Sequence, residues 1–336
     1  MAEPLSVALL SFWHVHAPGY AAEVQGHPDT RLAAVWDNDA ARGRDGAGRL
    51  GVDFTEDLDG LLARDDIDGV IVTTATDLHH EVILKAARAG KHIFTEKMLA
   101  PTVAQCEELV AAAAETHVKL VVSLPRLSEP MTLGIRQQLE AGNLGRLTYT
   151  RVRMAHDGWV KNWLPERFAD PDAAIGGALT DLGCHPVYLT QLFLGATPST
   201  VSATYTSVTG RPVEDNAVVT LTYPNGAIGV IEASNVTTPG AGTFELRGTE
   251  GSLLSGFGNS ALLAKGDHFD PETWTELALP EAGPSPLTQW ISAIEQDTGT
   301  EDNSRAAIEL TRMIVAANSA AERGRTLRYE PESAPA

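Results

Sequence analysis

Short apolar runs alternate with stretches of helical periodicity over the first part of the chain. Each run is mostly apolar or β-branched, which is typical of a strand buried on both faces. The predicted strands cover residues 5–10, 32–37, 69–73, 92–95 and 119–123. One of the intervening helices begins with a capping box formed by Thr102 and Gln105. The alternation predicts βαβ units, and therefore an α/β fold with a doubly wound parallel sheet in a first domain, residues 1–124.

A different pattern begins at Pro125, where strand candidates separated by Gly and Pro turns dominate. Helices are predicted at residues 132–141, around 176–194, at 286–297 and at 304–323. Strands are predicted at residues 146–155, 200–207, 216–223, 227–233, 243–246 and 251–254. This pattern predicts that residues 125–336 form an α+β domain with a largely antiparallel sheet and one open face. Because an open sheet face favours self-association, we expect a homo-oligomer, a dimer or a tetramer.

Composition narrows the classes of partner. A chain of 336 residues with 43% hydrophobic residues suits two globular domains, and it contains no apolar run long enough to span a membrane. The formal net charge of −19 disfavours nucleic acid and anionic membranes as partners. The first residues lack the basic segment of a signal peptide, so we expect a cytoplasmic protein. The two cysteines have no Cys/His spacing of a zinc site, and no metal is expected.

The first strand-to-helix turn is the place where a dinucleotide-binding sheet holds the diphosphate of its cofactor. A glycine-rich G-x-G-x-x-G turn is typical there, but residues 11–17 read Ser-Phe-Trp-His-Val-His-Ala, followed by Pro18. This turn alone argues against dinucleotide binding. The second strand argues for it, because Asp37 stands where a carboxylate binds the hydroxyls of an adenosine ribose and repels a 2′-phosphate. The same aspartate is also a good turn or helix-cap residue.

Two further patterns contain groups suited to proton transfer. Glu96 and Lys97 follow a predicted buried strand, so both lie at the ligand-binding edge of a parallel sheet. Asp181 and His185 are four residues apart, which on one helix places an imidazole beside a carboxylate that orients it. Each pattern also has an ordinary structural explanation, namely a surface lysine at a strand end and an ion pair on a helix.

Three motifs together resemble the glucose-fructose oxidoreductase, inositol dehydrogenase and MocA-type (Gfo/Idh/MocA) oxidoreductases. The first runs from Asp68-Gly-Val-Ile-Val-Thr-Thr to Asp77-Leu-His-His80. The second, Ala89-Gly-Lys-His-Ile-Phe-Thr-Glu-Lys97, is similar to the E-K-P segment of that family, with Met98 in place of the proline. The third, from Gly176-Gly177 through Asp181 to His185, is similar to its G-G-G-x-x-x-D-x-G-x-H segment, with Tyr188 where the family has an acidic residue. The resemblance covers nearly the whole chain.

The resemblance implies a Rossmann domain followed by an α+β domain, and NAD-dependent hydride transfer at a secondary alcohol of a sugar, polyol or related carbohydrate. NAD is preferred over NADP because of Asp37. The expected catalytic residues are Lys97, Asp181 and His185. The expected cofactor-binding residues are Ser11, Phe12, Trp13, His14, Asp37, Thr74, His79 and Glu96. The expected substrate-binding residues are His16, Arg126, His156, Asp157, Trp159 and Trp163.

Several alternatives stay open at this point. Without the glycine-rich turn, NAD is held by a remodelled turn, is held permanently, or is absent. A redox-neutral lyase, epimerase or glycosidase would oxidise the sugar transiently and return the hydride to the same molecule. A non-catalytic metabolite sensor would use the same fold without turnover.

Overall fold

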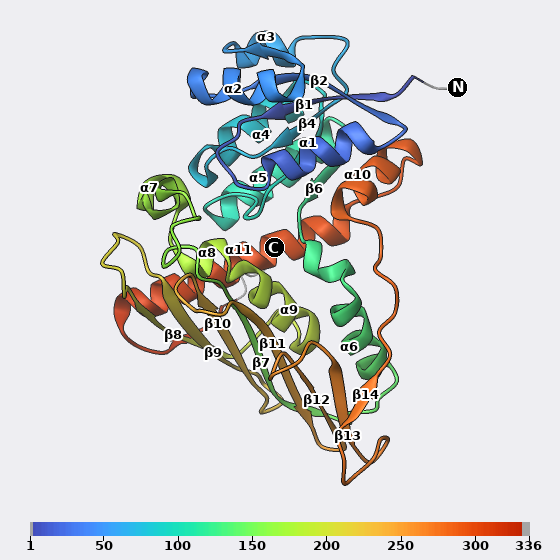
Figure 1. The fold of residues 1–336 in the computed structure, drawn as a ribbon, viewed down its shortest axis with the longest axis vertical. Helices are drawn as coiled ribbons and strands as arrows, with labels where there is room; N and C mark the ends of the chain where they lie inside the picture. The colour runs from blue at the N-terminus through green and yellow to red at the C-terminus, as the bar shows by residue number, and fades with distance from the viewer. Residues whose placement is uncertain (1–2, 331–336) are drawn as a thin grey trace. The chain divides into compact units, whose positions relative to one another are not determined.

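The computed structural model describes residues 3–330, which form two compact units (Figure 1). The first unit contains the chain up to Ser123 together with Pro284–Thr311. The second contains Leu124–Gly283 and the chain from Arg312 onward. The division predicted from the sequence placed residues 284–311 in the second domain. That assignment is wrong, because this segment packs with the parallel sheet.

The first unit is built on a parallel sheet of six strands in the order β3-β2-β1-β4-β5-β6. Its strands are β1 (Leu5–Leu10), β2 (Thr30–Trp36), β3 (Asp53–Thr55), β4 (Gly69–Val72), β5 (His92–Thr95) and β6 (Leu120–Val122). Its helices are α1 (Ala17–Gly26), α2 (Ala40–Leu50), α3 (Leu58–Leu62), α4 (His79–Arg88), α5 (Val103–Glu115) and α10 (Pro286–Glu295). This is the predicted doubly wound α/β fold, with β3 as a strand that the sequence pattern did not reveal. Only three residues long and partly exposed, β3 lacks the apolar run of the other strands.

One apolar cluster joins the sheet of the first unit to helix α10. Leu287, Trp290 and Ile291 lie in the same buried core as Leu9 of β1 and Phe94 of β5. The Trp290 indole is fully buried and donates a hydrogen bond to the backbone oxygen of Lys119 (3.2 Å). Burial of three large apolar side chains on one helix face explains why this segment folds with the parallel sheet.

The second unit is built on a mixed sheet of nine strands in the order β14-β13-β12-β11-β7-β10-β9-β8-β15. Its strands are β7 (Leu147–Ala155), β8 (Thr200–Thr206), β9 (Asn216–Thr222), β10 (Ile228–Ser234), β11 (Ala241–Gly248), β12 (Gly251–Ser255), β13 (Leu262–Gly266), β14 (Thr275–Leu277) and β15 (Leu327–Arg328). The β7–β10 pair is parallel and the other neighbouring pairs are antiparallel, which confirms the largely antiparallel sheet.

Side chains along this sheet alternate between a covered and a more exposed face. On β7, Val152 and Met154 are buried, whereas Arg151 and Arg153 are partly exposed and both bind Glu232 of β10. Helices α6 (Pro130–Glu140) and α9 (Cys184–Leu194) pack against the sheet. The remaining helices of the unit are the short α7 (Pro171–Ala174) and α8 (Ala178–Asp181).

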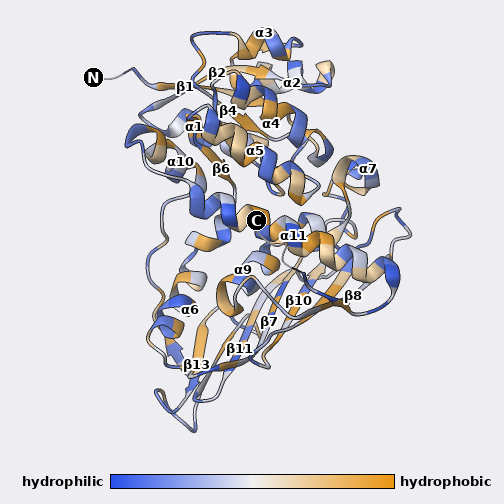
Figure 2. Ribbon diagram, turned by 180° about the vertical axis from the view of Figure 1, so that it is seen from behind, coloured by the Kyte–Doolittle hydropathy of each residue, from blue (hydrophilic) through white to orange (hydrophobic). Residues whose placement is uncertain are grey.

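The last helix, α11 (Glu301–Arg323), begins in the first unit and ends in the second. Figure 2 shows that its turns carry both hydrophobic and hydrophilic residues. Among residues 3–330, no helix combines the length and the apolar character that crossing a membrane requires.

Candidate active site

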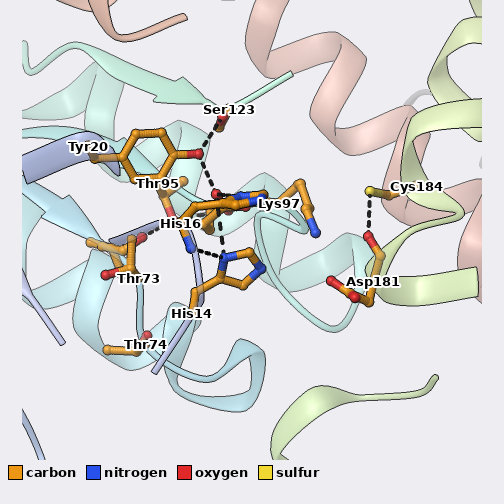
Figure 3. A network of polar contacts seen from close by, with 12 residues as sticks. His14, His16, Tyr20, Thr73, Thr74, Thr95, Lys97, Ser123, Asp181 and Cys184 are labelled. Carbon is orange, nitrogen blue, oxygen red and sulfur yellow. Dashed lines mark hydrogen bonds and ion pairs between the residues drawn. The ribbon is translucent and has the colours of Figure 1, made fainter. Parts of the chain in front are cut away.

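Polar residues from four strand ends converge at the ligand edge of the first unit, the expected Ser11 and Glu96 among them. Ser11, Thr73, Glu96 and Ser123 follow β1, β4, β5 and β6, and the carboxyl ends of parallel strands share one edge. The chain reverses its winding direction between β1 and β4, which is the position where open α/β sheets bind their ligands. Figure 3 shows side chains from these strand ends close together.

The turn after β1 directs its backbone donors into the protein. The amides of Ser11, Phe12 and Trp13 donate to the oxygens of Trp36 (2.6 Å), the Asp37 carboxylate (2.8 Å) and the Ser11 hydroxyl (3.1 Å). Ser11 has φ 82°, a conformation that favours glycine, so the serine keeps the sharp bend while adding a hydroxyl. In a glycine-rich turn such amides donate hydrogen bonds to a diphosphate. Here the three amides already donate to oxygens of the protein.

Phe12 and Trp13, both expected to bind the cofactor, have buried side chains. The Phe12 ring belongs to the apolar core and occupies the space beside Gly46, where a Cβ would lie 2.0 Å from the ring. The Phe12 ring is therefore a packing group of the core, and its assignment as a cofactor contact stays a prediction. Where a glycine-rich turn would leave space for a diphosphate, Phe12 and Trp13 place packed side chains.

Asp37 lies at the end of β2, as predicted, but it is already paired. The Arg42 guanidinium binds both carboxylate oxygens, with Nη2 2.6 Å from Oδ1 and Nε 2.9 Å from Oδ2. Arg42 also reaches the Ser11 hydroxyl (3.3 Å). The site at the end of β2 thus combines a carboxylate that suits ribose hydroxyls with a cation that suits phosphate.

Glu96 forms the centre of a buried polar cluster. Its carboxylate accepts hydrogen bonds from Tyr20 and from the backbone amide of Lys97 (3.1 Å), and it lies 2.7 Å from Nδ1 of His16. Nδ1 of His14 lies 3.7 Å from the same oxygen. Burial alone would raise the pKa of the Glu96 carboxyl, but the neighbouring His14, His16 and Lys97 side chains hold it well below its ordinary value. Glu96 is therefore ionised at neutral pH.

The His79 ring contacts the backbone of the segment that follows Glu96. The His79 ring is buried, and its Nδ1 lies 2.7 Å from the Met98 backbone oxygen and its Nε2 3.3 Å from that of Thr74. Burial lowers the pKa of His79, which favours the neutral ring. His79 and Thr74, both expected to contact the cofactor, thus connect two strand ends and help to position Lys97. The Lys97–Met98 peptide bond is cis.

In the second unit, Asp181 and His185 do not share one helix, and that prediction is wrong. Asp181 ends α8 and His185 lies in the first turn of α9. The helices separate at Gly183, where a Cβ would lie 2.7 Å from the Leu179 backbone. Nδ1 of His185 lies 2.9 Å from the hydroxyl of Tyr188.

Tyr188 connects His185 to another expected site residue. Its hydroxyl accepts a hydrogen bond from the Arg126 amide (3.1 Å), while the Arg126 side chain binds Glu129 (2.6 Å). Burial raises the pKa of Tyr188 well above its ordinary value, so the phenol stays protonated, and its hydroxyl can donate to Nδ1 of His185 or accept from it, depending on the tautomer. The structure brings Arg126 and His185 together through this tyrosine.

The loop expected to select the substrate is ordered by its own contacts. Asp157 accepts a hydrogen bond from the Trp163 indole (3.0 Å), and the His156 and Trp163 rings have centroids 4.7 Å apart. Trp163 is 51% exposed and offers an apolar face to a ligand. Trp159 is buried, and the Arg211 guanidinium lies over its ring (5.1 Å), so its role in substrate binding stays a prediction.

Sequence patterns missed Tyr20, Arg42, Thr73 and Tyr188. Tyr20 and Thr73 connect strand ends that are far apart in sequence. The Tyr20 hydroxyl, which donates to Glu96, also lies 2.8 Å from the Ser123 hydroxyl, and the Thr73 hydroxyl donates to the backbone oxygen of Ser11 (2.6 Å). No local motif marks such contacts. Tyr188 had a signal, because it replaces the acidic residue of the motif around His185.

A parallel sheet of this strand order, with an acidic residue after its second strand, defines a dinucleotide-binding Rossmann domain. Residues 15–124 match the family model described as "Oxidoreductase family, NAD-binding Rossmann fold", and residues 132–254 match "GFO/IDH/MocA C-terminal domain". The chain therefore belongs to the GFO/IDH/MocA family of oxidoreductases. The first match begins at residue 15, so β1 and most of the turn that follows it (residues 11–17) lie outside the match.

Characterised relatives and solved structures agree with this family. The chain is 29% identical to scyllo-inositol 2-dehydrogenase (NAD(+)) of Bacillus subtilis (strain 168), over 76% of this chain and 75% of the relative. It is 26% identical to inositol 2-dehydrogenase of Rhizobium meliloti (strain 1021), over 70% and 71%. A structure of GenD2 from gentamicin A biosynthesis, in complex with NAD, is 25% identical with a TM-score of 0.83 and covers 98% of both chains.

The residues of the first unit fit the adenosine ribose of NAD, but the turn at the diphosphate position differs from the usual glycine-rich site. Asp37 and Arg42 provide polar partners for the adenosine ribose. At the diphosphate position, the usual free amides are replaced by a turn with its amides bonded internally.

Proposed function

We propose that this protein is an NAD-dependent oxidoreductase that transfers a hydride to or from a secondary alcohol of a sugar, polyol or related carbohydrate. The observation that carries the proposal is the position of Glu96 and Lys97 at the carboxyl end of β5, in the segment that resembles the family's E-K-P motif. The names of the relatives, which act on inositols, support a cyclic polyol or a sugar as the substrate class.

Lys97, Asp181 and His185 are the proposed catalytic residues. The Lys97 ammonium binds the reacting oxygen and stabilises the negative charge that develops on it. His185 takes up the hydroxyl proton during oxidation and returns it during reduction. In the tautomer whose Nδ1–H donates to the Tyr188 hydroxyl, Nε2 of His185 is the nitrogen that accepts this proton, and Asp181 orients the ring. A bound nicotinamide supplies the hydride acceptor or donor.

NAD is the proposed cofactor, and Asp37 is the residue that favours it over NADP. The Asp37 carboxylate accepts hydrogen bonds from ribose hydroxyls and repels a 2′-phosphate. The bidentate Arg42 partner weakens this repulsion, so we expect kcat/KM for NAD to exceed that for NADP by a modest factor. Steady-state kinetics with both cofactors measures the ratio, and a preference for NADP would contradict the assignment.

The decisive test is the Lys97→Ala variant, assayed with NAD and a panel of inositols, sugars and glycosides. Loss of the ammonium is expected to lower kcat by about 10²–10⁴-fold. NAD binding, measured by protein fluorescence, is expected to change only slightly. Lys85→Ala is the matched control, because Lys85 is on the surface of α4 and pairs with Glu81 and Asp59. A fully active Lys97→Ala enzyme would refute the assignment.

The internally bonded turn after β1 favours one second candidate, a redox-neutral enzyme that retains NAD. Such a lyase, epimerase or glycosidase would convert glycosides without net formation of NADH in the same panel. A metabolite sensor would bind a compound of the panel and convert none.

Assembly into a dimer or tetramer and a cytoplasmic location stay predictions. Sedimentation tests the first and cell fractionation tests the second.

A further inference from the structure

A histidine–histidine–glutamate cluster lies at the carboxyl edge of the parallel sheet. His14 and His16 come from the turn after β1, and Glu96 follows β5 about eighty residues later. One ring nitrogen of each histidine and one carboxylate oxygen lie within 4.8 Å of one another. Figure 3 shows His14 and His16 side by side, and their ring centroids are 4.5 Å apart.

The spacing of the three donors is close to that of a metal site. Ligands about 2.0–2.2 Å from a tetrahedral zinc ion stand roughly 3.5 Å from one another. The Glu96 oxygen lies 2.7 Å from Nδ1 of His16 and 3.7 Å from Nδ1 of His14. Both distances are close to this separation, and small side-chain shifts would bring the three donors to a common ion.

The surroundings also suit a cation. Glu96 and His14 are buried, while the His16 side chain is 47% exposed, which gives an ion a path from solvent. The carboxylate brings a full negative charge into the protein interior, and a divalent cation compensates such a charge better than neutral imidazoles do.

The cluster is held on stiff elements. The His14 amide donates to the Thr73 backbone oxygen (3.0 Å), and Glu96 is held by its own amide, which donates to the Val72 oxygen (3.0 Å). Nδ1 of His14 accepts a hydrogen bond from the His16 amide (3.2 Å), which an ion bound at that nitrogen would replace. Two imidazoles and one carboxylate form the donor set of three-ligand zinc sites and of the iron(II) facial triad.

We propose that His14, His16 and Glu96 bind one divalent transition-metal ion, zinc in the first place, with a coordination position left open for water or another oxygen ligand. The sequence had led us to expect no metal, because the cysteines lack zinc-site spacing and the three ligands lie in two distant segments. The inference is independent of the proposed dehydrogenase activity, since it concerns metal affinity alone.

The test is metal binding by the full chain without a polyhistidine tag, after treatment with a chelator. Titration calorimetry with Zn²⁺ and the visible absorption of added Co²⁺ measure stoichiometry and coordination. We expect one ion per chain, with the intense Co²⁺ bands of four or five ligands. Removing one ligand should weaken binding by more than about 100-fold, since even loss of an outer-shell partner costs 10–100-fold. The variants are His16→Ala and Glu96→Gln.

His80→Ala is the matched control, because His80 also pairs with a glutamate (Glu108, 2.8 Å) but outside the cluster. Circular dichroism checks that each variant is folded, and His16→Ala decides the question if Glu96→Gln is not, because His16 is half exposed. Absence of saturable Zn²⁺ and Co²⁺ binding would overturn the proposal. So would binding that survives in His16→Ala, or that is lost equally in His80→Ala.

Discussion

Replacing Trp290 by alanine tests the assignment of residues 284–311 to the first unit. The Trp290 side chain is fully buried, its ring lies 6.1 Å from that of Phe94, and it packs on Gly69. These contacts join α10 to strands β4 and β5, the second of which leads to Glu96 and Lys97. The variant therefore removes a large apolar contact behind the candidate site without changing a site residue.

The expected cost follows from this burial. Truncation of a buried tryptophan to alanine costs about 3–5 kcal/mol, and the lost hydrogen bond to the Lys119 oxygen (3.2 Å) adds about 1 kcal/mol. For a domain of the size of the first unit, about 4 kcal/mol corresponds to a fall in Tm of roughly 8–16 °C. Gly69 and the flat sheet surface leave little room for the cavity to collapse, so the full cost is expected.

Differential scanning calorimetry is the suitable assay, because two units can unfold in separate transitions. The control is Trp163→Ala, since Trp163 is 51% exposed and its loss should cost about 1 kcal/mol or less. If Trp290→Ala lowered the free energy of unfolding by no more than the control, the reasoning about α10 would be refuted.

Two further predictions concern Tyr188 and His79. Tyr188→Phe removes a hydrogen bond worth about 1 kcal/mol to His185, so kcat should fall roughly 5–10-fold and its pH profile should shift, with KM nearly constant. In the control Tyr223→Phe, the lost hydroxyl donates to the Gly195 backbone oxygen (3.0 Å), and an equal loss of kcat there would argue against a positioning role of Tyr188. Burial lowers the pKa of His79 below its ordinary value of 6.5, so its neutral form stabilises the fold above that pH, and this stability is lost as the pH falls. The free energy of unfolding, measured with urea between about pH 7 and 5, should therefore fall less for His79→Gln than for the native protein. An equal dependence on pH in both proteins would exclude His79 as the source.

The sequence determined the fold class and the strand ends of the first unit. The predicted strands 5–10 and 92–95 coincide with β1 and β5, because strands buried on both faces appear as uninterrupted apolar runs. Such runs also place Asp37, Glu96 and Lys97 at the ligand edge without any structure. The short strands β13 and β14 were missed, because partly exposed strands lack a continuous apolar run. The break at Gly183 was also missed, because the sequence does not distinguish a glycine inside a helix from a glycine that ends one.

Only the tertiary structure decided which side chains share a site. Arg42 pairs with Asp37, the Tyr188 hydroxyl contacts Nδ1 of His185, and His14 and His16 meet Glu96. The last contact joins residues about eighty positions apart, and no local periodicity encodes it. It forms because strands β1 and β5, separated by β4 in the sheet, end at one edge. The residue types were visible in the sequence, whereas the cluster that they form depends on how the strands are ordered.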